Sequence, residues 1–342
     1  MNSFEDFRGN ETIVRTLRQA LESKRFPDSL LFAGSEGVGK RTLALMLAKA
    51  LNCLEVEGAF CNHCASCTKI DAGTHPDVAV VAVLEEKHFL QIDQLRQARK
   101  DVFYQPFEGR YRVIIIDEAD RMRDDGANSI LKMLEEPPPS TKIILLTARY
   151  HSLLPTVRSR CQIFSFAPVP LSMVRQFLAD RSDLTTEDRD LCARLAQGSL
   201  GRALSLDLES FRSLRSEVME LLQASLMTHS AEGIIEAADV LGKKKEHFEE
   251  RLDILYLLFQ DLFYLIHQAP EEQITNIDLL SSLQKLSKLV PPPSIPDIFF
   301  KLDAISSGLR INVNRLIALE DLAFLLTRIP SASSIRSPER EA

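Results

Sequence analysis

The stretch that decides the fold is "SLLFAGSEGVGKRTLALMLAKAL", residues 29–51. A short apolar run comes first, a glycine-rich segment follows, and apolar side chains then recur at helical spacing, which predicts a strand, a loop and a helix. The loop "GSEGVGKRT" follows the phosphate-binding pattern G-x-x-x-x-G-K-[ST] except at one position. We therefore predict a nucleotide-binding site formed by Gly34, Gly37, Gly39, Lys40, Arg41 and Thr42.

The departure from the pattern affects the metal rather than the phosphates. Arg41 stands where a Ser or Thr hydroxyl would bind Mg²⁺, and Thr42 comes one residue late. One residue along a helix turns a side chain by about 100°, so Thr42 cannot take over this position. Arginine has no acceptor atom for a metal and adds positive charge. The loop amides and Lys40 are still expected to hold phosphates, but ATP with Mg²⁺ should bind weakly and hydrolysis by this chain should be impaired.

Four further apolar, β-branched runs predict more strands of an open α/β fold with a parallel sheet, at residues 78–83, 112–117, 142–147 and 162–166. Beyond "APVP" at 167–170 the sequence is helical almost throughout, which predicts a small helical domain and then a larger one. The expected division is a nucleotide-fold domain at 1–168, a helical lid at 169–207, an all-α collar at 208–330 and a disordered tail at 331–342.

An acidic pair at the end of one predicted strand completes the candidate ATP site. In "VIIIDEAD", Asp117 is placed to hold the water shell of a metal, and Glu118 is placed to polarise an attacking water. The letters "DEAD" also occur in a class of RNA helicases. Those enzymes need two tandem motor domains, whereas here only helices follow the sheet, so we do not favour that alternative.

Composition limits the kinds of partner and location. The 342 residues have a net charge of −7 and 45% hydrophobic residues, as expected of a globular protein whose partners are proteins rather than naked nucleic acid. The start "MNSFEDFRGN" lacks the features of a signal peptide, and "ILYLLFQDLFYLI" is shorter than the roughly 18 apolar residues of a membrane span. We therefore expect a cytoplasmic protein that does not contact a membrane.

Four closely spaced cysteines predict a zinc site. Cys53, Cys61, Cys64 and Cys67 form the pattern C-x7-C-x2-C-x2-C within an insertion at residues 53–67. Four thiolates at such short separations suit a structural Zn²⁺ ion in tetrahedral coordination. A closed site of this kind has no open position for chemistry, so its role should lie in folding or docking.

The order of these motifs resembles the bacterial clamp-loader ATPases of the AAA+ class, the delta′ and gamma/tau subunits of DNA polymerase III. The phosphate-binding loop, the cysteine cluster, "IIIDEADRM", "LKMLEEPP", "TVRSRC", "GSLGRAL" and "NVNRLIALEDL" all take part, between about residues 4 and 329. The resemblance implies a subunit of the DNA polymerase III holoenzyme. Its partners would be gamma/tau and delta in an open five-subunit ring, the sliding clamp indirectly, and primed duplex DNA through sequence-independent phosphate contacts of the assembled ring.

Three site residues follow from this resemblance alone. Arg160 in "RSRC" matches the arginine finger, which reaches across a subunit interface to the γ-phosphate of a neighbour's ATP. Arg202 in "GSLGRAL" matches the lid arginine, which contacts nucleotide in the same chain. Thr147 matches the sensor position beside the phosphates.

Arg41 decides which branch of the family is favoured. Gamma/tau chains resemble G-x-x-G-V-G-K-T-[ST] at this point, so an arginine after the lysine favours a delta′-like stator that does not act as a motor. Asp117 and Glu118, which would be vestigial in a stator, are retained, and they keep a gamma/tau-like ATP-hydrolysing motor as the alternative. A third alternative is a stand-alone zinc-containing nucleotide-binding adaptor.

Overall fold

The computed structural model describes residues 3–84, 87–228, 247–308 and 315–327. The chain divides into two compact units, the first formed by 1–177 and 196–204 and the second by 178–195 and 205–342. The predicted tail lies outside the described residues, and the finer division into three domains stays a prediction. No helix in the described part of the chain is long and apolar enough to cross a membrane.

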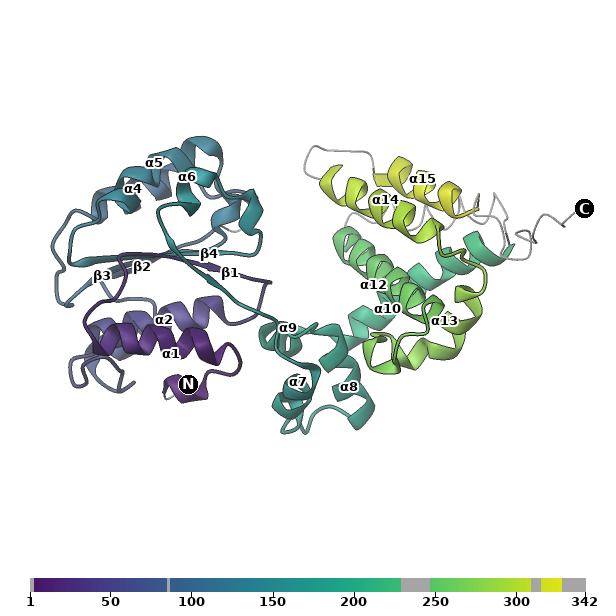
Figure 1. Cartoon of the computed structure of the whole chain (residues 1–342), viewed down its shortest axis with the longest axis horizontal. Helices are drawn as coiled ribbons and strands as arrows, with labels where there is room; N and C mark the ends of the chain where they lie inside the picture. The colour runs from purple at the N-terminus through teal and green to yellow at the C-terminus, as the bar shows by residue number, and fades with distance from the viewer. Residues whose placement is uncertain (1–2, 85–86, 229–246, 309–314, 328–342) are drawn as a thin grey trace, which may run out of the picture. The chain divides into compact units, whose positions relative to one another are not determined.

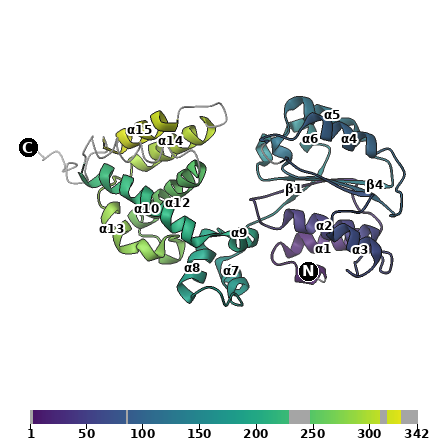
Figure 2. The same ribbon diagram turned by 180° about the vertical axis from the view of Figure 1, so that it is seen from behind.

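The first unit is built on a parallel sheet with helices on both sides (Figures 1 and 2). Its five strands are arranged in the order β2-β3-β4-β1-β5. This confirms the predicted α/β fold with a parallel sheet. The central strands β1 and β4 are buried at every residue, which explains their uninterrupted apolar sequences. The strands are β1 Ser29–Ala33, β2 Val78–Val81, β3 Arg112–Ile116, β4 Thr141–Thr147 and β5 Gln162–Ser165.

Helices cover both faces of this sheet, with α1 and α2 on one side and α4, α5 and α6 on the other (Figure 1). Alternate residues of β1 serve the two cores: Leu30 and Phe32 pack with the first set of helices, and Leu31 packs with the second. The helices are α1 Glu11–Glu22, α2 Lys40–Asn52, α3 Ala65–Asp71, α4 Ile92–Asp101, α5 Asp124–Glu135 and α6 Pro155–Arg158. Short 3-10 turns lie at Phe4–Asp6, Ala119–Arg121 and Tyr150–Ser152.

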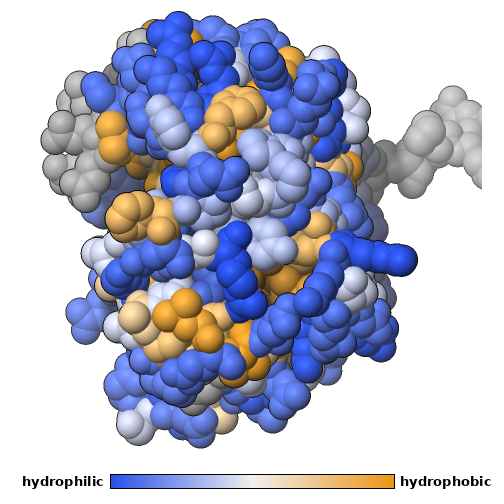
Figure 3. All heavy atoms as spheres, turned by 90° about the vertical axis from the view of Figure 1, so that its left-hand side faces the viewer, coloured by the Kyte–Doolittle hydropathy of each residue, from blue (hydrophilic) through white to orange (hydrophobic). Residues whose placement is uncertain are grey.

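The surface of the first unit is mainly hydrophilic on the side drawn in Figure 3, where apolar side chains form small separate groups. Among the described residues, exposed aromatic side chains follow α4, at Phe103, Tyr104 and Phe107. Helix α9, Leu200–Ser205, lies mostly in this unit, and its start packs against the loop between β1 and α2. Helix α7, Leu171–Leu178, follows the last strand.

The second unit is helical. Its core is formed mainly by leucine, isoleucine and phenylalanine side chains of α10, α12, α13, α14 and α15. The buried carboxylate of Asp261 on α12 accepts hydrogen bonds from the backbone amides of Thr275 (2.7 Å) and Asn276 (2.8 Å). The helices are α8 Thr186–Leu195, α10 Leu208–Gln223, α12 Phe248–Ile266, α13 Leu280–Ser287, α14 Ser294–Gly308 and α15 Arg315–Thr327. A π-helical segment at Ala224–Thr228 follows α10, and short 3-10 turns lie at Glu271–Gln273 and Ile277–Leu279.

Candidate functional site

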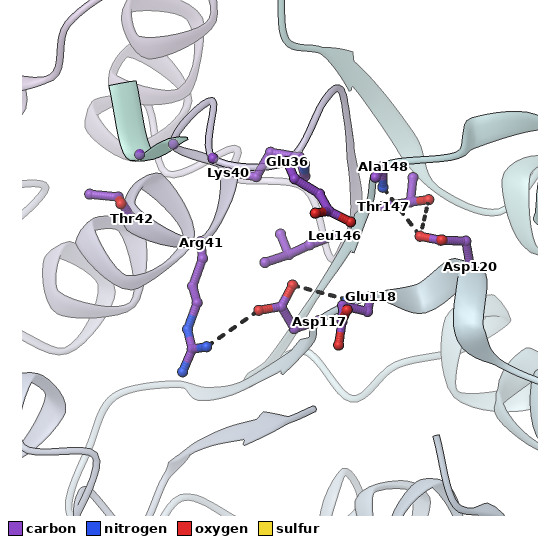
Figure 4. Close-up of a pocket in the computed structure, with 13 residues that line it drawn as sticks. Glu36, Lys40, Arg41, Thr42, Asp117, Glu118, Asp120, Leu146, Thr147 and Ala148 are labelled. Atoms are coloured by element: carbon purple, nitrogen blue, oxygen red, sulfur yellow. Dashed lines mark hydrogen bonds and ion pairs between the residues drawn. The ribbon is translucent and has the colours of Figure 1, made fainter. Parts of the chain in front are cut away.

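A pocket of about 290 Å³ lies at the carboxyl ends of β3 and β4 and beside the start of α2 (Figure 4). This is the position at which open parallel sheets bind ligands, because loops from neighbouring strands meet there. The pocket brings together most of the residues predicted for nucleotide and metal. Its lining residues are Glu36, Gly37, Gly39, Lys40, Arg41, Thr42, Asp117, Glu118, Asp120, Leu146, Thr147, Ala148 and Gly201.

The loop between β1 and α2 depends on glycine where other chain segments approach closely. Gly37 has a φ of 73°, and a Cβ there would lie 2.9 Å from the backbone nitrogen of Arg202. The Gly201 amide donates to the Gly37 carbonyl at 2.9 Å. The backbone of Arg202, the predicted lid arginine, therefore lies against the phosphate-binding loop. Its amide donates to the Ser199 hydroxyl at 3.1 Å.

Lys40 is the first residue of α2, and only 8% of it is exposed. Its Nζ donates to the carbonyl oxygens of Gly34 (2.5 Å) and Ser35 (2.7 Å). Burial lowers the pKa of Lys40, while the nearby carboxylates of the pocket oppose that shift. No ion pair to Lys40 occurs within the described residues. This buried ammonium group therefore has carbonyl partners but no anion in contact with it.

Arg41 reaches from α2 to the acidic end of β3 (Figure 4). Its Nη1 lies 3.5 Å from Oδ2 of Asp117, whose Oδ1 accepts the Glu118 amide at 2.9 Å. Thr42 points away from Asp117. The position of the metal-binding hydroxyl in the phosphate-binding pattern is thus occupied by a cation, which faces the first acidic residue.

Two other carboxylates of the pocket are held by neighbours. Glu118 has a left-handed backbone with a φ of 49°, and it pairs with Arg121 at 3.1 Å. Burial raises the pKa of Glu118. Asp120 accepts from the Thr147 hydroxyl (2.7 Å) and the Ala148 amide (3.2 Å), so the predicted sensor threonine is tied to an acid. Sequence reasoning missed this contact because it depends on β3 and β4 being neighbours.

Arg160 is not among the residues that line this pocket. It follows α6, and its Nε donates to Oε1 of Glu135 at 2.6 Å, while its Nη1 donates to the Thr156 carbonyl at 2.8 Å. Glu135 is the last residue of α5, and its side chain is 44% exposed. Only packing of α6 against α5 brings these two residues together, so no local sequence signal could have revealed the pair.

The four predicted cysteine ligands form one cluster, in which all sulfur atoms lie within 4.8 Å of one another. Cys53 caps the end of α2 and Cys64 caps the start of α3. The Cys64 amide donates to Sγ of Cys61 at 3.3 Å, and the Cys67 amide donates to Sγ of Cys64 at 3.4 Å. This close set of sulfur donors suits zinc in number and chemistry, so the cluster could bind it.

A buried polar network lies next to this cluster. The His75 Nε2 lies 3.1 Å from the Ser66 hydroxyl, and its Nδ1 accepts the Asp77 amide at 3.1 Å. The Asp77 carboxylate accepts three backbone amides, from Phe107, Glu108 and Gly109, at 2.7–2.8 Å. The network thus connects α3, which carries Cys67 and is capped by Cys64, to the loop before β3.

The fold and the pocket define a P-loop protein: a phosphate-binding loop joins a central strand to a helix, and an acidic strand end faces it. Two family models match most of the chain. The model described as "DNA polymerase III, delta subunit" matches residues 9–170, and the model for the C terminal of that subunit matches residues 209–328. The chain belongs to the family of DNA polymerase III delta′ subunits and their gamma/tau relatives.

Curated relatives agree with these models. The delta′ subunit of Bacillus subtilis is 28% identical over 92% of this chain and 95% of its own length. The delta′ subunit of Escherichia coli is 28% identical over 86% of this chain and 87% of its own length. The tau subunit of Bacillus subtilis is 29% identical over 85% of this chain but only 55% of its own length. A solved gamma subunit-related protein from Thermotoga maritima aligns with a TM-score of 0.40 at 20% identity, which is too low to add to the assignment.

Proposed function

We propose that the chain is a delta′-like stator of a bacterial clamp loader, the assembly that places a sliding clamp on primed duplex DNA. One observation carries the proposal: the chain's own pocket presents Arg41 to Asp117 at 3.5 Å, where an ATPase motor needs a metal site. The family relatives, delta′ and gamma/tau subunits, support membership of a ring that also contains delta.

In this proposal Arg160 acts on a neighbour's ATP rather than on nucleotide in its own chain. It lies outside the chain's own pocket, and its side chain is 30% exposed. A planar, permanently charged guanidinium suits the oxygens of a transferring phosphoryl group. On docking, Arg160 exchanges its bonds to Glu135 for the γ-phosphate across the subunit interface.

The proposed role of the cysteine cluster is structural. Zn²⁺ held by Cys53, Cys61, Cys64 and Cys67 would cross-link the end of α2 to the start of α3. Four protein ligands leave no position for substrate, so the ion would stabilise the fold and take no part in ATP turnover.

The test is a reconstituted ring containing Arg160→Ala, with Arg160→Lys as the matched variant. We expect the ring to assemble while ATP turnover at the one neighbouring site that Arg160 completes falls about 10³-fold and clamp loading slows, because fingers of this kind contribute roughly 10³–10⁵ in rate. Arg160→Lys should recover only part of the loss, since lysine lacks the planar fork. Unchanged turnover and loading with Arg160→Ala would refute the stator proposal.

The second candidate is a gamma/tau-like motor. It is favoured by one observation, the presence of Asp117, Glu118 and Thr147 in the same pocket as Lys40. A motor would hydrolyse ATP in its own pocket, and Lys40→Ala would then abolish this chain's share of turnover.

A further inference from the structure

The Mg²⁺ ion that a phosphate-binding loop implies does not suit the groups in this pocket. The residue after Lys40 supplies a guanidinium, which has no lone pair for a metal and stays charged at all ordinary pH values. Nη1 of Arg41 already lies 3.5 Å from Asp117, the carboxylate that would face the water shell of the ion. A divalent cation at this point would be repelled by the neighbouring guanidinium, and the carboxylate of Asp117 already pairs with that guanidinium.

The anion-binding part of the pocket is retained. Helix α2 is 13 residues long, and its first turn, with the positive end of its dipole, lines the pocket. Lys40 is buried with carbonyl oxygens as its hydrogen-bond partners, and no carboxylate pairs with it in the described part of the chain. A buried ammonium group whose contacts are carbonyl oxygens rather than a carboxylate, with a helix start beside it, favours a phosphate ligand.

The charges of the pocket allow that ligand. Three of its four acids have partners: Asp117 with Arg41, Glu118 with Arg121, and Asp120 with the Thr147 hydroxyl and Ala148 amide. The remaining acid, Glu36, is exposed on the loop. A polyphosphate that approached α2 would therefore meet two cations, one of which can exchange its carboxylate partner for phosphate.

We propose that this pocket binds the polyphosphate of a nucleotide without Mg²⁺, with the Arg41 guanidinium moving from Asp117 to the phosphate oxygens to supply the positive charge. The inference deepens the proposed function, because a stator of this kind would hold a nucleotide that it does not hydrolyse. In this state Asp117 competes with the phosphate oxygens for the Arg41 guanidinium and does not help to bind a metal.

The test is equilibrium binding of an ATP analogue with a fluorescent ribose substituent to the full chain, in Mg²⁺-free buffer and in millimolar Mg²⁺. A chelator is avoided because it would also remove zinc from the cysteines. Wild type should bind equally in both buffers. Arg41→Thr should bind about tenfold more weakly without Mg²⁺, as expected for loss of a charge-assisted hydrogen bond, and should recover when Mg²⁺ is added.

Asp117→Asn distinguishes a site in which Arg41 replaces the metal from a site in which Asp117 supports a metal, because the two predict opposite changes in nucleotide affinity. If Arg41 replaces the metal, removing the competing carboxylate should tighten Mg²⁺-free binding by about threefold, the size of an exposed ion pair. If Asp117 supports a metal instead, the same variant should weaken binding in the buffer that contains millimolar Mg²⁺. The Arg41 side chain is exposed, so the Arg41→Thr variant should fold normally. It therefore keeps the test informative if Asp117→Asn does not fold.

Three results would overturn the inference: tightening of wild-type binding by Mg²⁺ tenfold or more, weaker binding by Asp117→Asn in the Mg²⁺ buffer, or no binding at millimolar analogue. The reconstituted-ring experiment with Arg160→Ala reports on a different site and a neighbour's nucleotide. Its outcome therefore distinguishes failure of the stator proposal from failure of the metal-free site.

Discussion

At the scale of single residues, two arginines define the account. Arg41 occupies the position of a metal-binding hydroxyl and faces Asp117, whereas Arg160 is held outside that pocket by Glu135. One guanidinium thus lies in the chain's own pocket, and the other lies outside it. Both side chains carry the same charge, so the two proposed roles are distinguished by where the arginines lie in the fold.

Glu135→Gln tests whether the contact with Arg160 only holds the arginine in the free chain. We expect the free energy of unfolding to change by less than about 1 kcal/mol, because both side chains are partly exposed and such pairs are weak. Ring ATPase should not fall, since Arg160 remains. Urea unfolding and ATPase assays on the same preparation check this, and a loss as large as that of Arg160→Ala would mean that Glu135 itself is needed.

His75 predicts a pH dependence of stability. Burial lowers the pKa of this imidazole, while Glu108 and Asp77 act in the opposite direction. An unfolded histidine has a pKa of about 6.5, so below that pH the unfolded state binds more protons than the folded state until the folded pKa is reached. The contribution of the neutral His75 ring to the free energy of unfolding should therefore be fully present above about pH 7 and should decrease as the pH falls.

The measurement is urea unfolding of wild type and His75→Gln between pH 8 and pH 5, with zinc present. His75→Gln should be less stable at pH 8 but should lose the part of the slope that lies below about pH 6.5. His151→Gln, at an exposed histidine, is the control and should keep the wild-type slope. An unchanged slope in His75→Gln would assign the pH dependence to other groups.

At the scale of elements, the cysteine cluster joins the ends of two helices. Cys53 and Cys64 cap α2 and α3, and amides at the start of α3 already point at two of the sulfurs. Short helices such as α3 gain little from their own hydrogen bonds, so a metal cross-link would contribute directly to their stability.

Cys64→Ser should therefore lower the zinc content from one ion per chain to a small fraction and reduce the midpoint of thermal unfolding. Metal analysis of freshly purified protein and a thermal scan are the measurements. Cys161→Ser lies outside the cluster and should keep its zinc. Wild-type protein without zinc, or full zinc content in Cys64→Ser, would contradict the proposed site.

The sequence predicted elements better than the contacts between them. β1, β3 and β4 could be placed because buried parallel strands are continuous apolar runs, whereas the run predicted to end at residue 83 is a strand only to Val81. The phosphate-binding loop and the end of β3 were expected to meet, because strand ends share one edge of a sheet. The Asp120 contact with Thr147 depends on strand order, which single-strand patterns do not contain.

At the scale of the whole molecule, two units have separate cores. In the helical unit, the buried carboxylate of Asp261 holds the backbone at residues 275 and 276. Asp261→Ala would leave those amides unpaired, at a cost of about 3 kcal/mol. We expect calorimetry to show a lower unfolding midpoint for the helical unit and fluorescence titration to show unchanged nucleotide binding. Loss of binding would mean that the two units are coupled.

The most direct test of the stator account compares two variants in the same reconstituted ring, Arg160→Ala and Glu118→Gln. Single-turnover ATP hydrolysis is measured for each, with Arg160→Lys as the matched control for charge. We expect Arg160→Ala to slow hydrolysis at the adjacent ATP site about 10³-fold, while Glu118→Gln leaves hydrolysis unchanged because the pocket of this chain does not hydrolyse ATP. A large loss with Glu118→Gln and little change with Arg160→Ala would contradict the account and identify the chain as a motor.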